Sequence, residues 1–586
     1  MDIKIAPNKL NKNESELHVD ENQHVYTLIW ENWCGKSSIL ETIFKDYENI
    51  PWNWYLVAYS SWKNERFSKL YKKWIQTIKK NELDFIENKE NTDDFLIFNN
   101  LKWFYFDKTW AQILIFLATI LKRNGKVRKF LTDKKYIKIS DDQDITSSLT
   151  FRIHVSSKIR KFIQRLREKA ELDISINESS QWTSYLILEN IINSIDPYYD
   201  FDHKFISKIK INNNNFYDLL KKDIIQNIDF FYQYGITKNA ISITTISLKF
   251  KNGILLEDLS DWEFQILTVY AILDLFDSEN TIFLFDEIDS HLYYRRINEL
   301  RESLYQIKWT VITTTHIPDS ILWNKIDSLR LVEKWNIDEQ STMQEVINRM
   351  NSLTDHSEYQ KQLAWKCKYI ALVEDQTDWY IFTELLKKLI WKNKVEDLKN
   401  KVVSIKCSSW YATPNEIFWN SRINWIEDFK NVIKPWKQET KQIFWICDRD
   451  DFPILSINEK DFVRPKWVAK IEFKWCETHI LSWRRKQIEN YLLSYTMLKK
   501  MKKLNSINEE LAKKYQLKEW DKSDNRVIQE LEIKDKIKSL YSWGWTWVDY
   551  VKLQEIIDLI PVNEVSDDIK YMYNFINSKL DKCDQQ

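Results

Sequence analysis

Short apolar runs that end in polar or charged residues recur along the chain and predict buried strands. They occupy residues 25–30, 55–60, 281–289, 310–316, 368–374 and 442–451. Continuous apolar runs of this length are typical of strands in a parallel sheet, which is covered on both faces. A helical pattern over residues 36–44 follows the first run, and another follows the run at 368–374. We therefore predict an α/β protein.

Other stretches have a different pattern. From about Arg66 through residue 235 the chain is charged and predicted to be mostly helical, with residues 156–169 as its most basic helix. A basic helix usually has a solvated surface, so we expect residues 156–169 to face solvent rather than to bind DNA. The apolar run at 111–121 is too short to span a bilayer and predicts a buried helix. Residues 240–250 alternate as a strand does.

The segment after the first strand has the layout of a phosphate-binding P-loop, G-x-x-x-x-G-K-[ST]. Gly35, Lys36 and Ser37 match the motif, but Trp30 stands at its first glycine. A P-loop turns its backbone N–H groups toward phosphate, which requires positive φ angles and no side chain near the ligand. Tryptophan meets neither requirement.

Composition offers an explanation for this mismatch. The chain has 5 Gly and 28 Trp in 586 residues, whereas about 40 glycines are expected at this length. We hypothesise that the source reads UGA as glycine and that the sequence was translated with UGA as tryptophan. The alternative is a protein truly rich in tryptophan, but tryptophan recurs at the glycine positions of independent motifs.

Charge and cysteine content indicate which surfaces and which cellular environment to expect. Basic and acidic residues number 86 each, so any basic surface must be local. The six cysteines are scattered without C-x-x-C pairs, which favours free thiols in a reducing cytoplasm over disulfides or zinc. The start of the sequence lacks the pattern of a signal peptide. We therefore expect a cytoplasmic protein without a membrane partner.

Three further motifs appear in order after residue 258. Residues 259–263 read Leu-Ser-Asp-Trp-Glu, the strand at 281 ends in Asp286 and Glu287, and the strand at 310 ends in His316. With the P-loop, this set resembles the ABC/SMC-like ATPases, covering roughly residues 20–340. The first element is similar to their signature L-S-x-G-E, with Trp262 at the glycine.

The resemblance implies roles in ATP hydrolysis with Mg²⁺. Lys36 would neutralise the β- and γ-phosphates, Ser37 and Asp286 would hold Mg²⁺, Glu287 would polarise water and His316 would sense the γ-phosphate. Because the signature of one protomer completes the site of the other in this family, a homodimer or higher oligomer is implied. The implied nucleotide-binding residues are Trp30, Asn32, Trp33, Cys34, Gly35, Lys36, Ser37, Ser38, Ser260, Trp262 and Asp286. Asp289 and His291 are expected in a solvated turn.

A second group of acids lies beyond a polar linker at 336–365. Glu374 and Asp448 end predicted strands, while Glu489 lies in a predicted helix that opens at Arg484. Parallel neighbours bring their carboxyl ends to one sheet edge, where carboxylates can hold Mg²⁺ or Mn²⁺. The predicted metal ligands are Glu374, Asp378, Asp448, Asp450 and Glu489. Arg485 or Lys486 is a weaker candidate for offsetting transition-state charge.

This pattern resembles a TOPRIM domain, although Asp375 replaces the usual glycine after the first glutamate. An ABC-like ATPase followed by TOPRIM is the layout of the OLD family of nucleases. The resemblance implies an ATP-regulated, metal-dependent DNA endonuclease in anti-phage defence, with Glu374 as a possible general base and a possible partner protein. The expected parts are an ATPase in two pieces (1–120 and 236–345), a helical insertion or dimerisation region (121–235), a TOPRIM-like domain (366–500) and a helical tail (501–586) without assigned chemistry.

Two other functions remain open. An SMC-like ATPase could bind DNA or signal to a partner through an inactive TOPRIM-like domain, and Asp375 favours this alternative. A transporter ATPase is disfavoured because the sequence supplies no membrane partner.

Overall fold

The chain folds into two compact units, Met1–Gln340 and Ser341–Gln586. The computed structural model describes residues 2–5, 15–19, 23–29, 36–45, 54–60, 67–87, 102–106, 108–137, 145–172, 176–177, 179–220, 223–250, 253–277, 280–290, 292–333, 336–338, 343–353, 357–406, 429, 439–450, 453–458, 460, 463–464, 476–511, 516–522, 524, 526–543 and 547–584.

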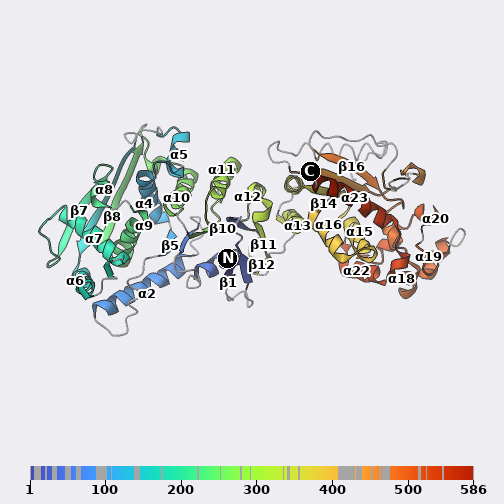
Figure 1. Cartoon of the computed structure of the whole chain (residues 1–586), viewed down its shortest axis with the longest axis horizontal. Coiled ribbons are helices and arrows are strands. Elements are labelled where there is room, and N and C mark those ends of the chain that lie inside the picture. Colours follow the sequence, from blue (N-terminus) through green and yellow to red (C-terminus); the bar gives the residue numbers. More distant parts are fainter. Residues whose placement is uncertain are drawn as a thin grey trace. The chain divides into compact units, whose positions relative to one another are not determined.

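The first unit combines a parallel sheet with helices and a small antiparallel sheet (Figure 1). Its strands are β1 Asp2–Ile5, β2 Ser15–His18, β3 Val25–Ile29, β4 Tyr55–Ser60, β5 Trp103–Phe106, β6 Ile145–Val155, β7 Phe205–Asn212, β8 Ile241–Phe250, β9 Thr281–Asp286, β10 Thr310–Thr315, β11 Leu329–Glu333 and β12 Asn336–Asp338. Its helices are α1 Lys36–Lys45, α2 Ser68–Ile86, α4 Lys108–Leu121, α5 Lys126–Asp133, α6 Ser157–Leu172, α7 Ser180–Asn193, α8 Phe216–Leu219, α9 Ile224–Phe230, the π-helix η4 Phe231–Thr237, η5 Leu256–Asp258, α10 Asp261–Phe276, α11 Tyr294–Tyr305, α12 Pro318–Trp323 and η6 Ile326–Ser328.

The large sheet has the order β12-β11-β3-β10-β9-β4-β5, and every pairing is parallel except that of β11 with β12. The predicted strand at 55–60 is observed without change, and the P-loop strand and its following helix are confirmed. Strands β3, β10 and β9 are neighbours, so the predicted P-loop, switch and acidic motifs follow three adjacent strands. This pairing decides where the first candidate site lies.

The prediction that residues 66–235 are mostly helical is wrong in part. The region contains β5, β6 and β7, and the last two join β8 in an antiparallel sheet of order β7-β6-β8. Residues of β6 alternate between buried and accessible positions, with Leu149 and Phe151 buried. This period of two was present in the sequence but was obscured by the helices on either side.

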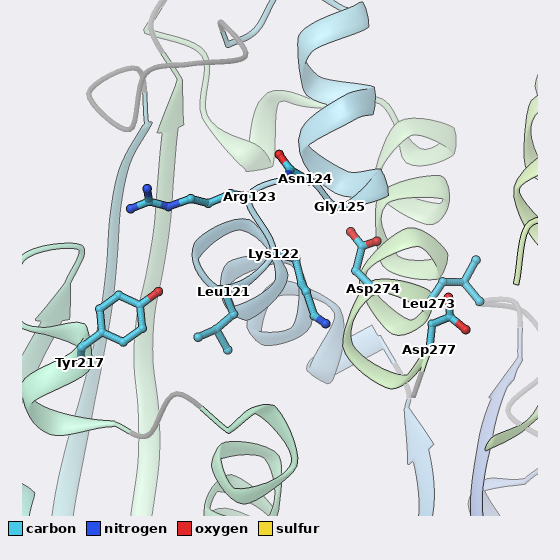
Figure 2. Close-up of a pocket in the computed structure, with 9 residues that line it drawn as sticks. All are labelled: Leu121, Lys122, Arg123, Asn124, Gly125, Tyr217, Leu273, Asp274 and Asp277. Carbon is cyan, nitrogen blue, oxygen red and sulfur yellow. The ribbon is translucent and has the colours of Figure 1, made fainter. Parts of the chain in front are cut away.

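Gly125 lies close to the carboxylate of Asp274, where a larger residue would require a shift (Figure 2). A Cβ atom at Gly125 would lie 2.3 Å from Oδ2 of Asp274. That carboxylate accepts hydrogen bonds from the N–H groups of Lys126 (2.7 Å) and Val127 (2.9 Å), which begin α5. The surrounding hollow of about 500 Å³ also carries Lys122, so its acidic and basic residues offset one another.

The second unit is built on a four-stranded sheet, and helices of the same unit surround this sheet in Figure 1. Its strands are β13 Tyr369–Val373, β14 Val402–Lys406, β15 Gln442–Cys447, β16 Glu477–Ser482, β17 Ser542–Trp543 and β18 Trp547–Val548. Its helices are α13 Met343–Leu353, α14 Ser357–Ala364, α15 Gln376–Leu389, α16 Lys392–Lys401, η7 Ile454–Ser456, η8 Ile488–Leu492, α18 Tyr495–Lys500, α19 Leu504–Leu511, α20 Arg526–Gln529, α21 Lys534–Lys538, α22 Tyr550–Leu559, η9 Val562–Glu564 and α23 Asp568–Asp584.

All pairings in the order β14-β13-β15-β16 are parallel. The prediction that the strands at 368–374 and 442–451 are parallel neighbours is therefore confirmed by the pairing of β13 with β15. Two expectations are corrected. The polar stretch at 336–365 contains α13 and α14, and Glu489 lies in the short 3-10 helix η8 rather than in a helix that opens at Arg484.

The tryptophans of the second unit occupy contrasting environments. Trp520 has a φ of 65° and a side chain that is 70% exposed, in a turn where the N–H of Asp521 donates to the carbonyl of Lys518. A left-handed φ disfavours a bulky residue and suits glycine. Trp483 is instead buried against Phe382 and Tyr491. The first environment supports the glycine hypothesis, and the second suits a true tryptophan.

The cysteines with described side chains are free thiols. Cys367, Cys447 and Cys476 are buried and unpaired by disulfides, and burial raises the pKa of Cys367 to about 12 and that of Cys476 to about 11. None of the described helices is both long enough and apolar enough to cross a membrane.

Candidate functional site

The first candidate site lies at the carboxyl ends of β3, β10 and β9. Asp286, the last residue of β9, is fully buried. Its Oδ1 accepts hydrogen bonds from Ser37 Oγ at 2.8 Å and from Thr314 Oγ1 at 2.7 Å. Ser37 begins the helix after the P-loop, so the structure brings together two residues that are distant in sequence and were assigned to one Mg²⁺ ion.

Glu287 follows Asp286 in a left-handed conformation with a φ of 52°. Its N–H donates to Thr314 Oγ1 at 3.1 Å, which helps to hold the turn. Its Oε1 lies 3.3 Å from Nδ1 of His316, the residue after β10. The predicted water-polarising acid and the predicted switch histidine are therefore neighbours.

Thr314 is a site residue that sequence reasoning missed. Its hydroxyl donates to Asp286 and accepts from Glu287, so it joins β10 to the acidic turn. The only signal was its place in the run Thr313–Thr315 just before His316. Gln265 of α10 also supports this turn through a hydrogen bond of 2.7 Å to the carbonyl of Ile288.

The expectation that Asp289 is solvated is wrong. Asp289 and Arg301 are each 1% exposed and form an ion pair of 3.0 Å. Arg301 also donates to Ser320 Oγ, so this pair ties the acidic turn to α11 and α12. A buried carboxylate needs such a partner because burial penalises an isolated charge. His291 lies outside the described residues.

The signature-like segment forms the beginning of α10. Ser260 is the N-cap, and its N–H and hydroxyl both donate to Glu263 Oε2. Trp262 is partly buried, and its ring lies beneath Lys134 Nζ at 4.3 Å and near the Arg296 guanidinium at 5.0 Å. A glycine at 262 would leave these two cations beside an open N-terminal turn.

Most residues of the P-loop lie outside the described part of the chain. Trp30, Asn32, Trp33, Cys34 and Gly35 lie outside the described residues, as does the side chain of Lys36. Ser38 is partly buried in the first turn of α1.

Comparison with protein families supplies the decisive observation for this unit. Residues 70–321 match the family model described as "AAA domain, putative AbiEii toxin, Type IV TA system". The first unit carries an AAA-like ATPase domain. The match begins after the P-loop and includes Ser260, Asp286 and His316, and it indicates nucleotide hydrolysis, for which such domains usually use Mg²⁺. A search of curated proteins found no match to the chain.

The second candidate site lies at the carboxyl ends of β13 and β15, outside the part that matches the ATPase domain. Glu374 follows β13, Asp378 is in the first turn of α15, Asp448 follows β15 and Glu489 is in η8. Asp378, Asp448 and Glu489 are all buried. Each of the four is close enough to another acid of the group for charge repulsion to be felt. We call these four residues the acid cluster.

A lysine from the C-terminal region lies within this cluster. Lys534, at the start of α21, places Nζ 3.3 Å from Asp448 Oδ2 and 3.5 Å from Glu489 Oε1. The four acids raise the pKa of Lys534 against the lowering effect of burial. Residues 501–586 had been expected to carry no chemistry, and no motif marked Lys534 because only the folded chain brings it to the acids.

Burial is the largest cause of the shifted acid pKa values. It raises the pKa of Asp378 well above its usual range, and Glu489 and Glu374 add to the effect. It also raises the pKa of Asp448, where Lys534 opposes the shift, and the pKa of Glu489 is raised in the same way. The cluster therefore favours either protons or a bound cation.

Asp375, which stands where the resemblance predicts glycine, has a structural role. Asp375 is the N-cap of α15, and its Oδ1 accepts from the N–H and hydroxyl of Thr377. Its φ of −137° is ordinary extended backbone, so glycine is not required there. Lys406 Nζ lies 2.6 Å from Asp375 Oδ2. Asp375 is thus a capping residue, and it does not distort the loop after Glu374.

The acid cluster has the oxygen ligands that suit a metal ion, but these ligands are not already arranged around one. Oε2 of Glu489 is buried and accepts no hydrogen bond from the described residues, as suits a cation ligand. No group of three or more His, Cys, Asp or Glu among the described residues is already arranged to hold a metal. Asp450 has a φ of 51°, and its N–H donates to the carbonyl of Lys486.

Basic side chains next to the cluster differ in their availability. Arg485 is 1% exposed and donates to the carbonyls of Asn490 and Lys522, and this structural role argues against the prediction that it offsets transition-state charge. Arg484 and Arg526 instead line a hollow of about 220 Å³. Arg449, between Asp448 and Asp450, donates to the carbonyl of Arg484 and so ties this hollow to the turn after β15.

Proposed function

We propose that the protein is an ATP-regulated, metal-dependent DNA endonuclease of the OLD type, which acts in defence against phage or other foreign DNA. In this proposal the second unit is a TOPRIM-like nuclease domain. The observation that carries it is the convergence of Glu374, Asp378, Asp448 and Glu489 on a parallel sheet edge, around Lys534.

The acid cluster supplies the ligand chemistry for Mg²⁺ or Mn²⁺. Bound there, such an ion would activate water and stabilise charge on the oxygens of a phosphodiester. Glu374, the acid of the cluster that is only partly buried, would accept a proton from that water. Lys534 would remain beside the reacting phosphate and offset its charge. Arg484 and Arg526 extend positive charge away from the cluster.

The ATPase domain would regulate this reaction. Ser37 and Asp286 would hold the Mg²⁺ that accompanies ATP, Glu287 would orient water and His316 would respond to the γ-phosphate. Lys36 and the P-loop would bind phosphate, and Ser260 of a second protomer would complete the site. The proposed assembly is therefore a homodimer or higher oligomer, with DNA as substrate and a possible partner protein.

The test uses purified full-length protein and supercoiled plasmid with Mg²⁺ or Mn²⁺. We expect nicking or linearisation, and we expect Asp448→Asn to reduce it by about 10³-fold or more while ATP hydrolysis is retained. The matched variant Glu287→Gln should abolish ATP hydrolysis. Intact plasmid under all conditions, or equal cutting by Asp448→Asn, would refute the nuclease proposal.

A second candidate function is supported by Lys534. Its contacts with Asp448 and Glu489 already balance part of the charge of the cluster without a metal. An SMC-like ATPase with an inactive TOPRIM-like domain would use these contacts only for folding. ATP-dependent DNA binding without strand breaks in the same plasmid assay would support this candidate.

A further inference from the structure

The antiparallel sheet β7-β6-β8 has two contrasting faces. Its inner face is apolar, and Phe151 of β6 packs against Phe231 of η4. Its outer face carries four exposed cations, Arg152, Lys208, Lys210 and Lys249. Serine, threonine and asparagine occupy most of the remaining outward positions. We call this outer surface the basic sheet face.

The strand register places cations of the same sign side by side. Arg152 of β6 is directly opposite Lys208 of β7, and Lys210 follows two residues later on the same face. Lys249 of β8 is opposite Thr146. Side chains opposite each other in an antiparallel pair are about 5 Å apart, and like charges there are destabilising. The register therefore concentrates positive charge on this face, where an external anion would relieve the repulsion.

The sheet supplies no acid of its own. None of the three strands contains Asp or Glu, although 86 of the 586 residues of the chain are acidic. Within the described residues, none of the four cations forms an ion pair. The positive charge of this face is thus not balanced by acids of the same strands.

The basic helix α6, which follows β6, provides a contrast within the same unit. Arg165 of α6 pairs with Glu168 at 3.2 Å, and Arg167 contacts both Glu189 and Asp200 at 2.9 Å. These cations are largely neutralised within the fold. Arg165 and Arg167 are therefore less available to an external anion than the exposed cations of the sheet, although Lys158 and Lys161 of the same helix are exposed.

We infer that the basic sheet face binds the phosphate backbone of double-stranded nucleic acid. Lysine and arginine neutralise phosphates, and serine and threonine hydroxyls donate to phosphate oxygens. The face carries no Phe, Tyr or Trp on which unpaired bases could stack, so a duplex is favoured over a single strand. This inference goes beyond the proposed nuclease activity, because it would hold for either candidate function.

The test measures binding of a fluorescent 30-base-pair duplex to the full-length protein by anisotropy. EDTA prevents cleavage, and the salt concentration is varied from 50 to 200 mM. For Lys208→Gln/Lys210→Gln we expect a rise in Kd of about tenfold at 0.1 M salt. The slope of log affinity against log salt should also become shallower by about 2.

The control is Arg165→Gln/Arg167→Gln on α6, which removes the same charge from the same unit at cations that are already paired with acids, and it should change Kd less than twofold. Circular dichroism and ATP hydrolysis should be unchanged in both double variants. Equal losses in the two double variants, an unchanged salt slope in the sheet variant, or tighter binding of a single strand or of polyglutamate than of the duplex would overturn the inference. Because cleavage is not read, failure of the nuclease proposal leaves this result unaffected.

Discussion

Both candidate sites lie at the carboxyl ends of parallel strands, but their acids have different partners. In the ATPase domain, buried Asp286 is held by the neutral hydroxyls of Ser37 and Thr314. In the second unit, four acids surround the cation Lys534. Both arrangements follow from parallel strands, whose carboxyl ends deliver polar residues to one edge.

The two sites therefore differ in how the negative charge of their acids is compensated. The two hydroxyl donors of the ATPase domain bind one oxygen, Oδ1 of Asp286, and leave the charge of this carboxylate available to a cation. The acid cluster contains more negative charge than Lys534 can balance, and burial raises the pKa of Asp378, Asp448 and Glu489. Its charge must therefore depend on protons and on Lys534, and in the proposed function it would depend on a bound metal ion as well.

The largest expected effect follows from removing the cation. Lys534→Met should lower the free energy of unfolding by about 3 kcal/mol in EDTA, because it leaves buried acids without their counter-charge. The loss should shrink as the pH is lowered from 8 to 5, because acids with raised pKa values take up protons more readily and then need less counter-charge. Urea unfolding at pH 5 and pH 8 measures both effects.

The matched control is Lys522→Met. Lys522 pairs with Asp567 on the surface, with side chains 41% and 44% exposed, so its loss should change stability by less than about 1 kcal/mol. If Lys534→Met is no more destabilising than Lys522→Met, the cluster does not depend on its lysine.

Removal of a hydroxyl group from the ATPase site should have a smaller effect on stability. Thr314→Val removes hydrogen bonds to Asp286 and Glu287, and it should lower stability by about 2 kcal/mol. ATP hydrolysis should fall by about tenfold because the turn that carries Glu287 loses its anchor. Thr313→Val, at an equally buried position, should affect hydrolysis less. Equal effects would show that Thr314 has only a packing role.

Proton release should distinguish the two sites further. Because the acid cluster favours protons, Mg²⁺ or Mn²⁺ must displace them, and affinity should rise with pH by up to about tenfold per unit for each proton displaced. Calorimetric titration of the ATP-free protein in buffers of different ionisation enthalpy counts the protons. Metal binding that is independent of pH and buffer would mean that Lys534 keeps the acids fully ionised.

The smallest effect concerns Trp520. In protein made with tryptophan at 520, Trp520→Gly should raise stability by about 1 kcal/mol, because the left-handed conformation is costly for a side chain. Trp483→Gly should instead lower it by about 3 kcal/mol or more through cavity formation. Thermal unfolding of both variants provides the comparison. A destabilising Trp520→Gly would remove this support for the glycine hypothesis.

The P-loop itself can be examined in protein from the native host. The mass of the peptide covering residues 25–36 should show glycine at positions 30 and 33. Tryptophan at both positions would prevent this loop from closing around phosphate and would contradict the roles proposed for Lys36 and Ser37.

Much of the fold was accessible from local pattern. The apolar runs at 55–60 and 310–316 became β4 and β10 because a strand buried on both faces leaves a strong signal. The strands β6 and β7 were missed because their alternation of polar and apolar residues is a weaker signal between helices. Asp289 was misjudged because its partner Arg301 is on another element.

The sequence by itself determined the order of the motifs, the strand ends that carry acids and the tryptophan excess. Those features are local, because a residue's place at a strand end depends on its neighbours in the chain. Only the tertiary structure decided that Thr314 joins Asp286 to Glu287, that Lys534 enters the acid cluster and that Arg152 lies opposite Lys208. These relations depend on strand pairing and helix packing between distant segments, and hydrophobic periodicity alone does not specify either.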